Sequence, residues 1–169
     1  ANAVYSSLDG ILFDQARTTL IQFPGGRGGG YAIPNTVTNI EDHAFDGCSS
    51  LTTVTIPNSV TSIGLQAFYN CTNLMTVTIG SSVTNIGSAA FEYCTGLTSV
   101  TIGSSVASIE SLVFFNCTSL TNVTIPNSVT TIGGGAFYNC TSLTSVTIPN
   151  SVTSIEVGLF SSCTSLTNI

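Results

Sequence analysis

Basic side chains are nearly absent from this chain. Its 169 residues include no lysine and only two arginines, Arg17 and Arg27, against eight acidic residues, so the formal net charge is −6. A protein that binds a phosphate backbone needs a basic surface that can replace counterions. The composition therefore argues against nucleic acid as a partner, and also against binding to an anionic membrane.

Long apolar runs are missing as well. No stretch approaches the length of about 18 consecutive apolar residues that a membrane span needs, so we expect no membrane insertion. Residues 1–4 have neither a basic start nor an apolar run, so a leader for export, if there is one, is not part of this sequence. Charged residues make up only 6% of the chain and hydrophobic residues 43%, which excludes a chain that charge keeps disordered.

What the chain has in abundance is one phrase that recurs every 23 residues. Its clearest copy, residues 120–142, reads LTNVTIPNSVTTIGGGAFYNCTS. Each copy has a cysteine, with a phenylalanine three residues before it and a leucine three residues after it. The cysteines are Cys48, Cys71, Cys94, Cys117, Cys140 and Cys163. A fixed period of this length with regular apolar columns predicts a leucine-rich solenoid, in which stacked coils share one core.

The first part of each coil has the pattern of a strand. Residues 120–126 alternate apolar and polar side chains over their second half, are rich in β-branched residues and end at a proline, which predicts one short strand per coil. Strands that successive coils supply in the same direction pair as a parallel sheet. Val123 and Ile125 then point inward, and Asn122 and Thr124 point outward.

The rest of each coil must turn and return. A Pro-Asn-Ser turn follows the strand, and we expect its serine hydroxyls to satisfy buried backbone groups. These serines are Ser59, Ser82, Ser105, Ser128 and Ser151. The return segment, residues 132–140 in one copy, is too short and glycine-rich for a long helix. A single 3₁₀ or α turn at 136–139 is expected instead.

The phrase LTSVTIPNSVTSI at 143–155, with AFYNCTSL at 136–143, resembles the BspA-like leucine-rich repeats, a class found in surface proteins of bacteria and some protists. The resemblance covers residues 31–169. It implies a right-handed β/α solenoid with its parallel sheet on the concave face. It also implies secretion or display at the cell surface, and adhesion to proteins or other cells.

The chain divides into two parts. Residues 1–27 are expected to form an N-terminal β-hairpin cap and a glycine-rich connector, and residues 28–169 a solenoid of six 23-residue coils. Residues 20–24 imitate the repeat strand, with Ile21 and Phe23 in the inward positions, which predicts a degenerate first strand beside the sheet. The glycine-rich stretch lacks the Lys-Ser/Thr pair of a phosphate-binding loop, so a flexible connector is favoured over a phosphate site.

The other end of the sequence stops halfway through a strand, with Ile169 at a core position. An apolar face and a strand edge are expected to be open there. We predict that the 169 residues are a fragment of a longer chain, or that a second copy covers this end by self-association.

The six cysteines occupy one column. Their side chains are expected to point in parallel toward the core, whereas a disulfide needs side chains that face each other. Buried, reduced thiols are therefore favoured, disulfides between neighbouring coils are a weaker alternative, and zinc is the weakest because a linear column cannot surround an ion. We expect no cofactor and no metal.

Catalytic candidates are scarce. The only histidine, His43, lies on a return segment and is favoured as a surface residue, with a weak metal contact beside Glu41, Asp42 or Asp46 as the alternative. One histidine without a nucleophile elbow gives no basis for acyl transfer. We expect a protein that is not an enzyme and has no catalytic residues.

The outward face of the sheet is the predicted partner-binding site. It consists of two polar columns, which are Thr53, Thr76, Ser99, Asn122 and Ser145, and Thr55, Thr78, Thr101, Thr124 and Thr147. Threonine also simply favours strands, so a structural spacer of a larger surface protein is the alternative to a recognition or adhesion scaffold. An ice-binding threonine array is a remote third hypothesis, because three of the five rows lack the second threonine.

Overall fold

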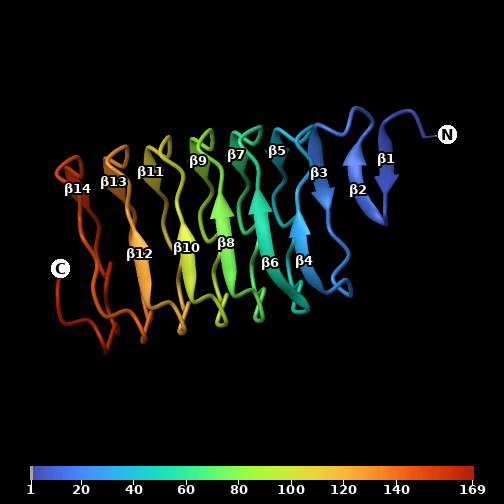
Figure 1. Cartoon of the computed structure of the whole chain (residues 1–169). Helices are drawn as coiled ribbons and strands as arrows, with labels where there is room; N and C mark the ends of the chain where they lie inside the picture. The colour runs from blue at the N-terminus through green and yellow to red at the C-terminus, as the bar shows by residue number, and fades with distance from the viewer. Residues whose placement is uncertain (1) are drawn as a thin grey trace.

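Two rows of short strands run along the molecule, with one apolar core between them (Figure 1). The structure is a computed structural model that describes residues 2–169. Each coil passes from one row to the other and back, so residues 23 positions apart lie side by side. We call the row with the longer strands the main sheet and the other the lateral row.

The main sheet contains five parallel strands, each paired with the strand one coil away. They are β4 (Gly29–Ala32), β6 (Leu51–Ile56), β8 (Thr76–Ile79), β10 (Ser99–Thr101) and β12 (Asn122–Thr124). Val77 of β8, for example, is opposite Val54 in β6 and Val100 in β10. Beyond β12 only isolated bridges continue the pairing, the first of them between Thr124 and Thr147. The predicted parallel sheet of stacked coils is confirmed.

The lateral row consists of two-residue strands and is interrupted. In sequence order, its strands are β5 (Asn39–Ile40), β7 (Ser62–Ile63), β9 (Asn85–Ile86), β11 (Ser108–Ile109), β13 (Thr131–Ile132) and β14 (Ser154–Ile155). The first three pair in parallel in one sheet and the last three in another. Within residues 2–169, no pairing joins β9 to β11, although the main sheet is continuous at the same junction.

The N-terminal hairpin extends the lateral row. Strand β1 (Tyr5–Leu8) pairs antiparallel with β2 (Ile11–Asp14), which pairs antiparallel with β3 (Thr19–Gln22). Strand β3 then pairs in parallel with β5, with Leu20 opposite Ile40. The prediction that residues 20–24 lie beside the main sheet is therefore wrong. Leu20 rather than Ile21 takes the buried position, which places the segment in the register of the lateral row.

The turn between β2 and β3 is held by one carboxylate. Asp14 Oδ1 accepts the N–H groups of Thr18 and Thr19 at 2.7 and 2.8 Å, and its Oδ2 accepts the Thr18 hydroxyl at 2.7 Å. These bonds, led by the one from Thr19, hold the pKa of Asp14 below its usual value because they favour the charged form. The hairpin cap thus has its own local anchor.

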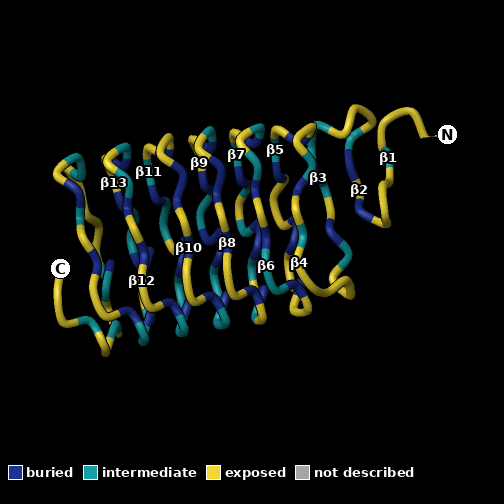
Figure 2. The backbone as a smooth tube through the Cα atoms, in the orientation of Figure 1, coloured by how far each residue is buried: buried dark blue, intermediate teal, exposed yellow. Residues whose placement is uncertain are grey.

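A stack of phenylalanine rings runs through the core. Consecutive ring centroids are 4.5 to 5.7 Å apart, and all pairs after the first are within 17° of parallel. The rings belong to Phe23, Phe45, Phe68, Phe91, Phe114, Phe137 and Phe160. The valine and isoleucine columns of the two rows are buried around this stack, as the dark stretches of the tube in Figure 2 show.

The return segments contain hydrogen-bonded turns. No helix of any kind occurs in residues 2–169, and so none could cross a membrane. The expected 3₁₀ or α turn at 136–139, and with it the β/α description, is not borne out. Each segment has two residues with positive φ, such as Gln66 at 51° and Asn70 at 56°, which a right-handed helix cannot contain.

The hydrogen bonds made by the N–H groups of a return segment explain why turns form there instead of a helix. The N–H of Phe68 donates to the carbonyl of Ala90 in the next coil at 2.8 Å. The N–H of Tyr69 donates back to Gln66 in its own turn at 3.0 Å. Because alternate N–H groups bond to the neighbouring coil, the segment cannot also make the uninterrupted bonds of a helix.

Threonine hydroxyls repeat the main-chain bonds between coils. Thr61 donates to the carbonyl of Thr38 through its N–H, at 2.8 Å, and through its hydroxyl, at 3.2 Å. Thr84 does the same to Thr61. A second such column, beside the main sheet, contains Thr98, Thr121, Thr144 and Thr167. The first column, which contains Thr61 and Thr84 and is called the lateral threonine column, is broken at Ala107. This residue has no hydroxyl, and its N–H makes no described bond to Thr84.

The last coil is the least buried part of the core. The exposed fractions are 53% for Ile155 and 69% for Ile169, both in core columns. Phe160 is only half-buried, unlike the preceding rings of the stack. The open apolar face expected here is present, and its coverage by a second copy stays a prediction.

Candidate functional site

All ten residues predicted for partner binding lie on the outward face of the main sheet. The register places Thr78 beside both Thr55 and Thr101, and the column continues through Thr124 to Thr147. All five threonines of this column are exposed, because alternate residues of a strand point to opposite faces. The second column is Thr53, Thr76, Ser99, Asn122 and Ser145, of which only Thr53 is half-buried.

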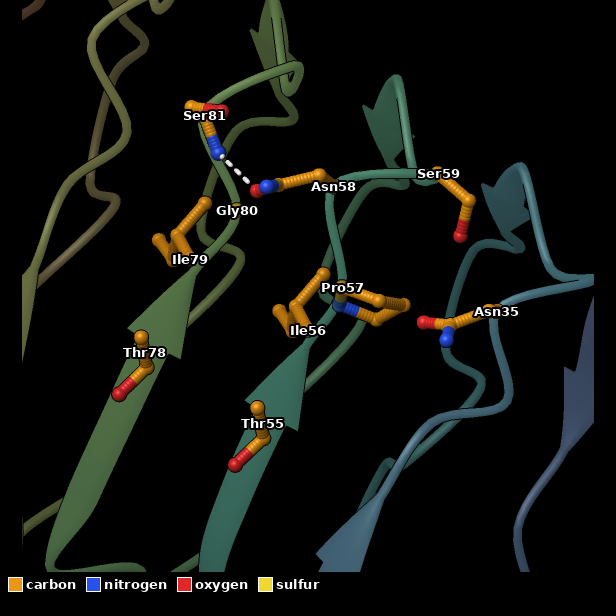
Figure 3. A pocket seen from close by; sticks show the side chains of 10 residues that line it. All are labelled: Asn35, Thr55, Ile56, Pro57, Asn58, Ser59, Thr78, Ile79, Gly80 and Ser81. Atoms are coloured by element: carbon orange, nitrogen blue, oxygen red, sulfur yellow. Dashed lines mark hydrogen bonds between the residues drawn. The ribbon is translucent and has the colours of Figure 1, made fainter.

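A hollow of about 720 Å³ opens where β6 and β8 end (Figure 3). Thr55 and Thr78 lie side by side at one end of the hollow, and the turns that follow the strands rise above them (Figure 3). Its lining residues are Asn35, Thr55, Ile56, Pro57, Asn58, Ser59, Thr78, Ile79, Gly80 and Ser81. The hollow therefore combines hydroxyl and amide groups with a small apolar floor.

Close packing of the turns shapes this hollow. A Cβ at Gly80 would lie 2.5 Å from the carbonyl oxygen of Pro57, so only glycine allows the two coils to approach in this way. A hydrogen bond also joins one coil to the next here, because Asn58 Oδ1 accepts the N–H of Ser81 at 2.8 Å. The Nδ2 group of Asn58 makes no bond to the described residues and can donate to a ligand.

The turn serines behave differently from one another. The Ser151 hydroxyl donates to the carbonyl of Val129 at 2.7 Å, as the sequence predicts. The hydroxyl oxygens of Ser59 and Ser128 are buried without a partner, so the prediction is wrong for these two. Ser59 lines the hollow, but its hydroxyl oxygen is itself buried and is not presented to a ligand there.

The hollow is repeated further along the face. A second one, of about 320 Å³, lies over β12 and the following coil. It is lined by Asn122, Val123, Thr124, Ile125, Asn127, Ser145, Val146, Thr147 and Pro149. The same combination of strand threonines and turn asparagine occurs in both, so the face offers similar groups at more than one coil.

Charge is confined to the other side of the coils. Neither hollow has a charged lining residue. From residue 28 onward there is no arginine or lysine, and every acidic residue belongs to a return segment. These residues are Glu41, Asp42, Asp46, Glu92, Glu110 and Glu156. The outward face of the main sheet can therefore recognise a neutral surface but has no ion pair to offer.

Sequence comparison decides the family. The profile described as the BspA type leucine rich repeat region matches residues 30–117 and 93–169, in six copies. The chain belongs to the BspA-type leucine-rich repeat family. No curated protein matches the chain.

Solved structures of leucine-rich repeat proteins give the same fold. The leucine-rich repeat protein TpLRR of T. pallidum is 32% identical with a TM-score of 0.86, and the match covers 97% of this chain and 77% of that one. A leucine-rich repeat protein from Eubacterium ventriosum is 30% identical with a TM-score of 0.80, over 95% of this chain and 50% of that one. A leucine rich cell surface protein from Faecalibacterium prausnitzii is 34% identical with a TM-score of 0.66, over 98% of this chain and 39% of that one.

The cysteines of this BspA-type chain form a hydrogen-bonded column. All six are free thiols, and all but Cys163 are buried. Each thiol donates to the carbonyl of the phenylalanine in the preceding coil, as Cys94 does to Phe68 at 3.1 Å and Cys117 to Phe91 at 3.2 Å. Burial raises the pKa of Cys94 and of Cys117 above the usual 9.0. The sequence predicted the buried thiols but not their role as donors between coils.

The remaining candidates do not converge on a site. His43 is half-exposed, and its Nδ1 is 3.7 Å from the Asp46 carboxylate, one turn along the same return segment. Within residues 2–169 no three histidine, cysteine, aspartate or glutamate side chains lie close enough together to hold a metal ion. Sequence reasoning missed Asn35, Asn58 and Ser81 as lining residues, because the Pro-Asn-Ser motif indicated a turn and gave no sign that neighbouring turns enclose a hollow.

Proposed function

We propose that this BspA-type chain is a recognition and adhesion scaffold of the cell surface, not an enzyme, and that it binds a protein or another cell through the outward face of the main sheet. The observation that carries the proposal is the unbroken, exposed threonine column with the hollow at its N-terminal end. The Faecalibacterium prausnitzii relative is a leucine rich cell surface protein, which supports the location.

The chemistry of the face favours a neutral partner. Exposed hydroxyl and amide groups donate and accept hydrogen bonds, whereas a charged partner would lose its counterions and gain no ion pair. The array of main-sheet threonines gives many weak contacts at the spacing of the strands, about 4.8 Å. A partner that engages several coils at once gains affinity from their number.

Adhesion of coated beads tests the proposal. Beads that carry the protein should adhere to cultured cells more than beads that carry albumin. Thr78→Glu and Thr101→Glu should abolish the difference, because each buries an unpaired carboxylate at the contact. Asn85→Glu, which adds the same charge to the exposed surface of the lateral row, is the matched control and should adhere like the unmodified protein.

The alternative is a spacer that only holds other parts of a surface protein apart. Wild-type beads that adhere no better than albumin beads would favour the spacer. Equal adhesion of all three variants would show that another surface makes the contact.

A further inference from the structure

The main sheet and the lateral row do not end together at the N-terminal side. The lateral row continues beyond β5 through β3, β2 and β1, whereas the last strand of the main sheet is β4 (Figure 1). Residues 19–28 follow the path of a return segment. Leu20 is opposite Ile40, and the ring of Phe23 stacks on Phe45 at 4.9 Å. This extra coil therefore has a return half but supplies no strand to pair with β4.

The free edge of β4 presents main-chain groups. The N–H groups of Gly29 and Ile33 donate to the carbonyls of Ser50 and Thr55 in the next coil, at 3.1 and 3.0 Å. Because successive residues of a strand direct their N–H and C=O groups to opposite sides, Gly30 and Ala32 direct theirs away from β6. Both residues are exposed, and no described strand lies on that side of β4.

The side chains at this edge leave room for an added strand. Gly29 and Gly30 have no side chains, and Ala32 stands in the column that holds threonine in later coils. On the inner side Tyr31 is only half-buried. The Arg27 guanidinium lies over its ring at 5.7 Å and over Phe23 at 5.8 Å, and Nη1 donates to the carbonyl of Asp9 at 2.8 Å. One exposed side chain, which an added strand must displace from the Tyr31 ring, thus covers the aromatic end of the core at this edge.

The occupied positions of the main sheet show what would fit. The coils of β6, β8, β10 and β12 each hold an apolar, a polar and an apolar residue, as Val54, Thr55 and Ile56 do, with the polar residue outward. Beside β4 the same alternation would place one apolar side chain against the half-buried ring of Tyr31 and the other beside Ile33, whose own side chain is already buried. An extended peptide with this pattern would cover the half-buried ring and pair the free main-chain groups at the same time.

We propose that the free edge of β4 binds an extended segment of another protein by strand addition. The segment has the pattern apolar, neutral polar, apolar, and its main chain bonds to Gly30 and Ala32. This site is separate from the outward face of the main sheet, so it does not depend on the adhesion proposal. Its specificity comes from the two inward side chains, and the main-chain bonds supply sequence-independent affinity.

Amide hydrogen exchange tests the edge directly. The probe is an acetylated and amidated peptide of sequence LTTVTIPN, which copies residues 51–58. At saturation we expect exchange at Gly30 and Ala32 to slow by about tenfold or more, with little change at Ile33, which is already bonded. Unchanged exchange at Gly30 and Ala32 would overturn the proposal, as would equal protection by a peptide in which glutamates replace the valine and isoleucine.

A pair of substitutions at one position gives the control. Ala32→Pro removes the outward N–H but leaves the bonds to β6, and should weaken peptide binding by about tenfold or more. Ala32→Thr, the residue of the later coils, keeps the N–H and should bind like the unmodified protein. Equal binding by both variants would contradict strand addition, and the exchange measurement on the unmodified protein decides the matter if Ala32→Pro fails to fold.

Light scattering separates this proposal from self-association. A monomer in the absence of peptide is expected. A dimer whose Ala32 amide is already protected would show that a second copy is the occupant, and would overturn the proposal of a separate partner.

Discussion

The main sheet is continuous where the lateral row is interrupted, at the same junction between two coils. Strand β8 pairs with β10 in full register, whereas β9 and β11 belong to separate sheets. The lateral threonine column fails at Ala107, which lacks both the hydroxyl bond and the N–H bond to Thr84 that its equivalents make. Pairing in one row therefore depends on the side chains of its own columns, even though the two rows share a core.

A glycine column explains part of the interruption. A Cβ at Gly87 would lie 2.6 Å from the main chain of the preceding coil, so this column favours glycine. The N–H of Gly133 donates to the preceding coil at 2.8 Å and that of Glu156 at 3.2 Å, while that of Glu110 makes no such bond among the described residues. A side chain in this column thus weakens the main-chain hydrogen bond to the preceding coil. At the junction of Glu110, the missing hydroxyl bond of Ala107 weakens the pairing of the lateral row further.

A rise in pH is expected to destabilise both rows together, because the thiols lie in the core that the rows share. Burial raises the pKa of Cys94 and of Cys117 above 9.0, so these thiols stay neutral in the folded protein after they ionise in the unfolded chain. The free energy of unfolding is then fully retained below pH 9 and falls above it, by about 1.4 kcal/mol per pH unit for each thiol. Urea titrations near pH 7.5 and near pH 10 measure the change.

The double variant Cys94→Ala, Cys117→Ala controls for the tyrosines, which also ionise at high pH. Its urea midpoint should fall less steeply with pH than that of the unmodified protein. Identical midpoints at the two pH values in the unmodified protein would contradict the buried thiol column.

Phe91→Ala tests the core that the two rows share. The ring is fully buried and stacks on Phe68 and Phe114, so its removal should cost about 3–5 kcal/mol of unfolding free energy. Thr101→Ala, on the exposed face of β10, should cost about 0.5 kcal/mol or less. Equal losses at the two positions, measured by urea denaturation, would show that the assigned register is wrong.

Gly87→Ala tests whether the glycine column limits the lateral row. The added methyl group meets main-chain atoms that cannot rotate away, so we expect a loss of about 1–3 kcal/mol and weaker amide protection in β9. Gly26→Ala is the matched control, since a Cβ there has no neighbour within 4 Å. A variant at Gly87 as stable as the one at Gly26 would remove the steric explanation.

Ala107→Thr should repair the lateral row. The new hydroxyl can donate to the carbonyl of Thr84, as Thr84 does to Thr61, with an expected gain of about 0.5–1.5 kcal/mol. Ala107→Val has nearly the same shape without the hydroxyl and should gain less. If the two variants are equally stable, the hydroxyl bonds do not contribute to the difference between the rows.

The sequence was sufficient for the features that the 23-residue period repeats. Alternation along the strand predicted that Val77 points inward and Thr78 outward. The 23-residue interval predicted that each residue lies beside the residue at the same position of the next coil. The turns of the return segments could not be predicted in this way. Positive φ occurs there at residues such as Gln66 and Leu112, which do not favour it intrinsically, and it is maintained by bonds to a neighbouring coil.

The candidate site was predictable to a similar extent. Strand alternation located all ten residues of the outward face, but the hollow depends on how the turn at Asn58 approaches Ser81, a contact between coils. The free edge of β4 depended on the register of β3, which pairs through Leu20 and not through Ile21. Both features are set by long-range pairing, which a local pattern does not contain.

The separate bonds between successive coils also determine how the molecule responds to force. A pull along the solenoid axis loads the junctions in series, so the weakest one opens first. A coil that opens replaces a spacing of about 4.8 Å with an extended segment of 23 residues, roughly 75–80 Å long, so the chain lengthens by about 70 Å. We expect this lengthening to begin at the junction of Ala107 and Glu110, which the main sheet alone bridges with paired strands, or after β12, where only isolated bridges continue that sheet.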